Sequence, residues 1–180
     1  LSTATGQDLL VTEELRRLGS LVRQAELLAE QYDAVVANPP YMGGNAMNSS
    51  IKKFAKDYFP DSKSDLFAVA TERFLKLAGP TAFVGLMTPF TWMFLKSYEA
   101  LRHLLLEAKT LRSLIQPQYH TFFESAAVPV CTFTLQNSIT SSYDASFIKL
   151  SKFRGAELQP VKTLEAIRDP TCDWLYRAKP

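Results

Sequence analysis

The sequence predicts an α/β fold with a mainly parallel sheet and one inserted antiparallel strand. Short β-branched apolar runs, typical of buried strands, alternate with segments of about 12 or more residues that have helical periodicity. Such alternation favours right-handed crossovers between parallel strands. The connection between Ile115 and Val128 carries no helical stripe, so it predicts a turn into an antiparallel strand.

An amphipathic helix is predicted for most of residues 1–31. Its apolar positions recur in steps of four and three, which places them along one face of a helix. They are Val11, Leu15, Leu18, Val22, Ala25 and Ala29. Gly19 followed by Ser20 is a candidate break within this helix. We treat residues 1–31 as an N-terminal helical segment.

A strand is predicted at residues 32–37, where Tyr-Asp-Ala-Val-Val-Ala is the kind of apolar run found in strands buried on both faces. Asn38-Pro39-Pro40 ends this strand, because proline cannot continue a hydrogen-bonded ladder. Residues 42–64 are rich in glycine, asparagine and serine, which indicates a mobile loop. One short basic helix is expected within it, containing Lys52, Lys53 and Lys56.

The remaining elements follow from the same two periodicities. Ser64 is the expected N-cap of a helix that reaches Ala78 and is stopped by Gly79-Pro80. Further elements are expected at residues 82–87 (strand), 94–108 (helix), 110–115 (strand), 128–135 (strand) and 145–150 (strand). Serine-rich residues 138–142 are typical of a linker. We therefore divide the rest of the chain into residues 32–137 and a C-terminal segment, 138–180, that is otherwise unassigned.

Composition excludes several classes of protein. The chain has 180 residues, of which 47% are hydrophobic, so it can bury a core. No apolar run is long enough for a membrane span, which leads us to expect a cytoplasmic protein. Cys131 and Cys172 lack the spacing of a zinc site, and no metal is expected. The start at Leu1 and the abrupt end suggest a segment of a longer chain.

The strand that ends in Asn38-Pro39-Pro40-Tyr41 carries the chemistry. Asn38 offers a side-chain oxygen, and Pro39 offers a backbone carbonyl that Pro40 holds in an extended conformation. Two fixed acceptors facing the protons of an aromatic amino group would localise its lone pair, which suits methylation of such a group. The Tyr41 ring suits stacking on an unpaired base, a contact that contributes about 1 to 3 kcal/mol. Stacking needs the ring rather than the hydroxyl.

Other interpretations apply to each of these residues. Two prolines can simply terminate a strand while Tyr41 packs on a neighbouring helix. His120 and Cys131 are each expected to be structural, because the transfer needs no strong base. Lys52, Lys53, Lys56 and Lys63 can contact phosphates or form an ordinary solvated face.

These residues also carry a resemblance to a known family. Residues 32–41 resemble motif IV of the amino-methyltransferases, and Ser64-Asp65-Leu66-Phe67 with the following helix resembles motif V. Val84 to Trp92 resembles the next strand and its proline turn. More narrowly, residues 38–50, 59–67 and 119–134 are similar to PglX, the adenine-specific methyltransferase family of bacteriophage-exclusion (BREX) systems. The resemblance covers roughly residues 32–137.

The resemblance implies the C-terminal half of a Rossmann-like class I methyltransferase sheet with one antiparallel strand. It implies methyl transfer from S-adenosylmethionine to N6 of a flipped adenine in DNA, with Asn38 and Pro39 as acceptors. Tyr41 and Phe123 would stack on the base; the alternative for Phe123 is that it and Phe122 are ordinary core residues. Pro40, Asp65 and Phe67 would contact the cofactor.

In this family the glycine-rich turn and the acidic residue that bind the donor precede the Asn-Pro-Pro-Tyr strand, and neither is found upstream of it here. We therefore expect an inactive fragment of a site-specific DNA adenine-N6 methyltransferase of phage defence or restriction-modification. Its expected partners are double-stranded DNA and the remainder of its own chain. The exposed edge at residues 32–37 predicts self-association. The alternatives are a methyltransferase for protein glutamine or RNA, and a non-catalytic interaction module.

Overall fold

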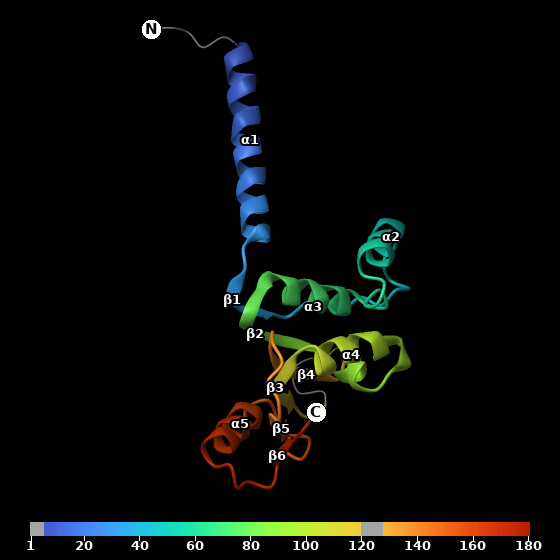
Figure 1. Ribbon diagram of the computed structural model, residues 1–180, viewed down its shortest axis with the longest axis vertical. Helices are drawn as coiled ribbons and strands as arrows, with labels where there is room; N and C mark the ends of the chain where they lie inside the picture. Colours follow the sequence, from blue (N-terminus) through green and yellow to red (C-terminus); the bar gives the residue numbers. More distant parts are fainter. Residues whose placement is uncertain (1–5, 120–127) are drawn as a thin grey trace. The chain divides into compact units, whose positions relative to one another are not determined.

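The computed structural model describes residues 6–119 and 128–180, and contacts divide the chain into two compact units (Figure 1). The first unit, Leu1–Gln31, contains the single helix α1 (Gly6–Ala29). The predicted helix is confirmed, but the break expected at Gly19-Ser20 is absent because one glycine among strong helix formers costs only about 1 kcal/mol. In the described part of the chain, no helix is long and apolar enough to cross a membrane.

The second unit, Tyr32–Pro180, contains the sheet and its covering helices. In chain order its elements are β1 (Tyr32–Ala37), α2 (Ser49–Tyr58), α3 (Leu66–Leu77), β2 (Ala78–Pro89), the 3-10 turns η1 (Phe90–Met93) and η2 (Lys96–Tyr98), α4 (Glu99–Glu107), β3 (Thr110–Gln116), β4 (Val130–Gln136), β5 (Ala145–Lys149), α5 (Leu158–Arg168) and β6 (Leu175–Ala178).

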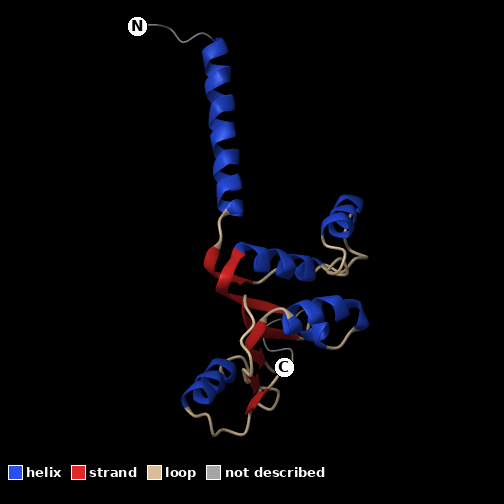
Figure 2. Cartoon of the chain, viewed as in Figure 1, coloured by secondary structure: helices blue, strands red, loops and turns tan. Residues whose placement is uncertain are grey.

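The six strands form one mixed sheet with the order β1-β2-β4-β3-β5-β6, seen as the central red ribbons of Figure 2. Strand β1 is parallel to β2, and β3 is parallel to β5. Strand β4 lies between β2 and β3 and runs antiparallel to both, which confirms the predicted inserted strand. Strand β6, which the sequence did not predict, is antiparallel to β5. Strand β1 therefore lies at one edge of the sheet.

Helices α3 and α4 cover one face of the sheet (Figure 1). Alternate residues of each strand point toward them, as expected for period-two side chains. This face is the main core, with Phe67, Leu101, Leu105, Val84 and Leu135 all almost fully buried. In β4 the apolar residues alternate with polar ones, so its sequence shows which face these helices cover.

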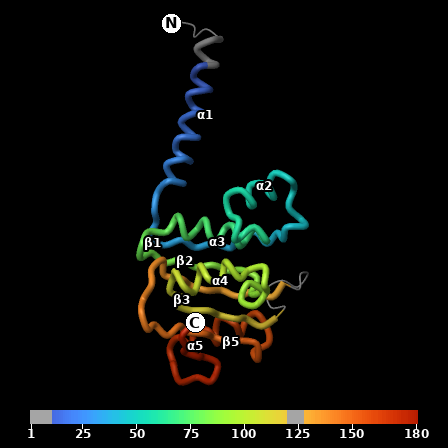
Figure 3. Tube along the Cα trace, turned by 45° about the vertical axis from the view of Figure 1, so that its right-hand side comes forward, coloured from blue at the N-terminus to red at the C-terminus, as the bar shows by residue number. Residues whose placement is uncertain are grey.

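Helix α5 covers the opposite face near β3 and β5. It comes after both strands in the sequence, as the colours of the tube in Figure 3 show. There Ile115 and Ile148 pack with Ala166 of the helix. Toward β1 this face lies open in the second unit. Val36 of β1 is 83% exposed and Phe83 of β2 is 44% exposed. The expectation that residues 32–37 are buried on both faces is therefore wrong for this chain.

Two local predictions around α3 need correction. Asp65, and not Ser64, is the N-cap, because its carboxylate accepts from the backbone N–H of Phe67. The helix ends at Leu77, and Gly79-Pro80 belongs to β2 rather than to a turn. Strand β2 can include Pro80 because this end of the strand is sparsely paired. In the register with β1, Ala78 lies opposite Tyr32, and the next paired residue of β2 is Phe83.

Candidate active site

The Asn38-Pro39-Pro40-Tyr41 loop leaves the sheet at the carboxyl end of β1, beside the carboxyl end of β2. Ala37 pairs with Leu86, so Asn38 lies at the level of Met87. In open α/β sheets this edge is where ligands bind. Asn38 and Pro40 are exposed, whereas Pro39 is buried between them. The buried proline anchors the loop, and its exposed neighbours face outward from it.

The hydroxyl of Tyr41 lies between two oxygens. It is 2.9 Å from Oδ1 of Asn38 and 3.2 Å from the backbone carbonyl oxygen of Met87. The chain thus turns back so that Tyr41 contacts both the first residue of its own loop and the end of the neighbouring strand. A side-chain amide, a phenol and a main-chain carbonyl meet at one point of the sheet edge.

The ring of Tyr41 is half-buried and packs against the core under α3. Its edge meets the ring of Phe67, with 6.4 Å between centroids and an 85° angle between planes. The ring of Phe67 in turn packs against that of Tyr98, with 5.3 Å between the ring centroids. Burial raises the pKa of the Tyr41 hydroxyl to about 12, with a smaller contribution from Cys131. The phenol is therefore neutral and able to donate throughout the physiological pH range.

Asp65 fastens the residue that follows Tyr41. Its Oδ1 accepts from the backbone N–H of Met42 at 3.0 Å and from that of Phe67 at 3.2 Å. The backbones are also joined, because Leu66 donates to the carbonyl of Met42 and Gly44 donates to that of Ser64. One carboxylate thus caps α3 and holds the end of the Asn38–Tyr41 loop.

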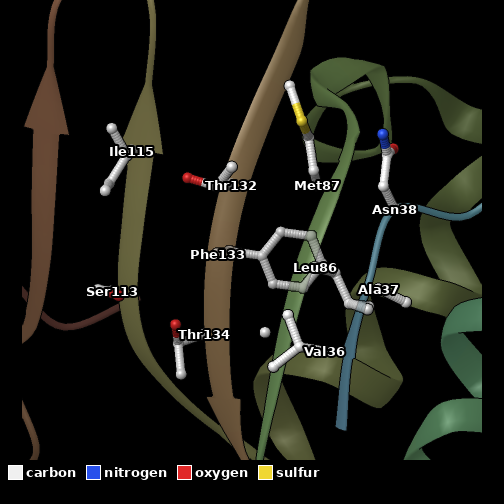
Figure 4. Close-up of a pocket in the computed structure, with 11 residues that line it drawn as sticks. Val36, Ala37, Asn38, Leu86, Met87, Ser113, Ile115, Thr132, Phe133 and Thr134 are labelled. Carbon is white, nitrogen blue, oxygen red and sulfur yellow. The ribbon is translucent and has the colours of Figure 1, made fainter. Parts of the chain in front are cut away.

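A hollow of about 500 Å³ opens on the sheet face opposite α3 and α4, with Asn38 at its rim (Figure 4). Its wall crosses four strands, from Val36 on β1 through Met87 on β2 and Thr132 on β4 to Ser113 on β3. The lining is largely apolar, and its polar side chains are those of Thr132, Thr134, Ser113 and Asn38. Figure 4 shows Asn38 and Met87 next to each other at the strand ends.

The predicted site residues are brought together only in part. Asn38 and Tyr41 are in direct contact, while Phe123 and His120 lie outside the described residues. Of the residues assigned to the cofactor, Pro40 is exposed, Phe67 is 1% exposed in the core, and Asp65 is 9% exposed and bonded to two backbone N–H groups. Of these three side chains, only that of Pro40 is exposed.

Sequence reasoning missed two features of this site. The first is the Met87 carbonyl, a main-chain group that no residue-type pattern reveals. The second is the loop-fastening role of Asp65, for which a signal existed: aspartate directly before an apolar helical stripe is a strong N-cap candidate. The described lysines of α2 stay exposed, and Lys53 pairs with Asp57.

The fold is that of the class I methyltransferases. A Streptococcus thermophilus type I restriction-modification methyltransferase subunit superposes with a TM-score of 0.63 at 19% identity, covering 84% of this chain and 35% of that one. A Listeria monocytogenes protein solved as a class I S-adenosylmethionine-dependent methyltransferase gives 0.58 at 12% identity, covering 79% and 43%. DrdV in its DNA complex gives 0.58 at 13% identity, covering 87% and 18%.

The chain belongs to the Eco57I restriction-modification methylase family, whose model matches residues 9–123. It is 40% identical over 145 residues to the adenine-specific methyltransferase BrxX of Escherichia coli O9:H4 (strain HS), covering 79% of this chain and 12% of that protein. It is 31% identical over 164 residues to the adenine-specific methyltransferase PglX of Lacticaseibacillus casei (strain Zhang), covering 90% and 14%. The chain therefore spans about one eighth of the length of these relatives.

Proposed function

We propose that these residues form the catalytic-motif half of a site-specific DNA adenine-N6 methyltransferase that works in phage defence or restriction-modification. The observation that carries the proposal is the Asn38 amide oxygen, which lies beside the Tyr41 hydroxyl at the ligand-binding edge of a methyltransferase sheet. Family membership supports the chemistry, and the names of the relatives support adenine as the base.

The residues of this chain act on the amino group of the target base. Adenine N6 is a weak nucleophile because its lone pair is delocalised into the ring. Asn38 Oδ1 and the Pro39 carbonyl each accept one N6 proton, which localises the lone pair on nitrogen. Reaching the site requires the adenine to leave the duplex, and the rings of Tyr41 and Phe123 would then stack on the exposed base.

The donor is S-adenosylmethionine, which supplies an electrophilic methyl group. The three side chains assigned to the donor do not by themselves form an open donor site: Phe67 is in the core, Asp65 is buried with its Oδ1 bonded to two backbone N–H groups, and Pro40 alone is exposed. We therefore assign donor binding to the remainder of a longer chain. This agrees with the small share of the relatives that these residues span.

Double-stranded DNA is the proposed partner, and the cytoplasm is the proposed location. Structures with this fold have been solved with DNA, among them DrdV and the Type ISP restriction-modification enzyme LlaGI. The exposed lysines of α2, which begins eight residues after Tyr41, would contact phosphates.

The decisive experiment replaces Asn38 by alanine in the full-length protein. We expect N6-methyladenine in recovered DNA to disappear while the melting temperature stays within a few degrees, because no core volume is lost. Asn45→Ala, which removes an exposed amide of the same loop, is the matched control and should methylate normally. Normal methylation by a folded Asn38→Ala protein contradicts the mechanism. Methylation of protein or RNA in place of DNA would select the alternative substrates.

A further inference from the structure

We propose that the Tyr41 hydroxyl is a positioning group that holds the Asn38 side chain with its oxygen, rather than its amino group, available to the target base. This role is separate from stacking, and it rests on the proposed function. It arises from the position of the hydroxyl 2.9 Å from Asn38 Oδ1 and 3.2 Å from the Met87 carbonyl.

Asn38 needs such a group because its side chain is exposed and its two ends have nearly the same shape. A rotation of 180° about the last torsion exchanges an acceptor for a donor. In the wrong orientation the amide would present N–H groups to the N6 protons, and it would repel the base instead of polarising it. A hydroxyl that donates to the oxygen therefore favours the productive orientation.

The hydroxyl is itself held independently of Asn38. The Tyr41 ring packs on Phe67, and the next residue, Met42, is fastened by Asp65. The second acceptor, the Met87 carbonyl, belongs to a strand paired on both sides. The hydroxyl therefore links the rigid position of β2 to the Asn38 amide, for which the described residues show no other side-chain hydrogen bond.

The geometry leaves room for the base. An amide oxygen has two acceptor sites, so Asn38 Oδ1 can keep its bond from Tyr41 and still accept one N6 proton. The phenol has one proton for two facing oxygens, and its donation to Asn38 Oδ1 is the state that holds the amide while the base is bound. Because the hydroxyl remains protonated at working pH, this arrangement is available throughout the cycle.

The test compares Tyr41→Phe, Tyr41→Ala and wild type in the full-length protein, by single-turnover methylation and by DNA affinity. Tyr41→Phe keeps the ring and removes only the hydroxyl. We expect the rate at saturating DNA to fall about 5- to 10-fold, the equivalent of one neutral hydrogen bond, while the DNA KM stays within about twofold. Tyr41→Ala should lower the rate further and also raise KM, because stacking is lost. Tyr58→Phe, an exposed hydroxyl on α2, is the control.

Three outcomes would overturn the inference. A Tyr41→Phe rate equal to wild type means that the ring is sufficient. A Tyr41→Phe protein with the same rise in KM as Tyr41→Ala means that the hydroxyl serves binding or folding, and melting temperatures separate those two. A wild-type protein that makes no N6-methyladenine refutes the proposed function itself, and that arm is measured first.

Discussion

Asp65 provides the sharpest test of how the site loop is held. In Asp65→Ala, two backbone N–H groups lose their acceptor, that of Met42 in the loop and that of Phe67 at the start of α3. Both lie in part-buried or buried surroundings, so water replaces the carboxylate poorly. The variant therefore removes a helix cap and a loop contact by one change.

The magnitude follows from these two bonds. Loss of an N-cap costs about 1 kcal/mol, and loss of a bond to a charged acceptor costs about 1.5 to 3 kcal/mol. The free energy of unfolding should therefore fall by about 2.5 to 4 kcal/mol. For a chain of this size that corresponds to a fall in melting temperature of about 5 to 15 °C. Asp65→Asn keeps an oxygen acceptor and should lose less than half as much.

Thermal unfolding followed by circular dichroism measures both variants, with Asp61→Ala, an exposed carboxylate of the same loop, as the control. The reasoning is refuted if Asp65→Ala melts no lower than Asp61→Ala.

The pH dependence of stability is a second check. Burial raises the pKa of Asp65 above its usual value, although its bonds from Phe67, Met42 and Leu66 oppose this. The folded protein therefore takes up the proton more readily than the unfolded chain. As pH falls from above the raised pKa of folded Asp65 to below its ordinary pKa in the unfolded chain, wild type should gain stability relative to Asp65→Asn.

Three further predictions concern the chain as a whole. Burial raises the pKa of Cys131 to about 11, so a thiol reagent at pH 8 should modify native Cys172 and should reach Cys131 only after unfolding. The Cys172→Ser variant should therefore show no labelling in the folded state. Full labelling of Cys131 in the folded protein would contradict this prediction. Calorimetry should detect no appreciable S-adenosylmethionine binding by the isolated chain, and stoichiometric tight binding would place the donor site within these residues. Light scattering should show self-association that rises with concentration, through the open edge at β1, and Val36→Lys should reduce it. A strict monomer with protected Val35 and Val36 amides would show that this edge is closed.

Most strands and helices up to β5 could be predicted, because the spacing of their apolar residues indicates which residues are buried. β4 alternates apolar and polar residues, β2 is an apolar run in which alternate residues are buried, and the missing helical stripe after Ile115 correctly indicated an antiparallel strand. Helix α5 gave no such signal, because it buries Gln159 and Ala166 while Val161 and Ile167 are exposed. β6 has only four residues and little burial. Pattern analysis requires a hydrophobic face, and these elements lack one.

The site was predictable to the extent that it consists of side chains in a distinctive order. Asn38 and Tyr41 were identified from their place after a strand, and the structure brings them into contact. Their contact with each other was not predictable, because it depends on how the loop returns over β2 to reach the carbonyl of Met87. That return is set by Asp65, which lies 23 residues beyond Met42 and meets it only in the folded chain.

The strand order has a consequence for how the site is assembled during synthesis. β4 is the last of the first four strands to be made, yet it fills the position between β2 and β3. At elongation rates of about 5 to 20 residues per second, the roughly 40 residues between β2 and β4 take about 2 to 8 seconds to synthesise. During that interval β2 has one unpaired side, and its end, where the Met87 carbonyl receives Tyr41, lacks its second neighbour. This edge of the sheet is thus completed late, after Val130–Gln136 has left the ribosome, and a translational pause before that segment would prolong the incomplete state.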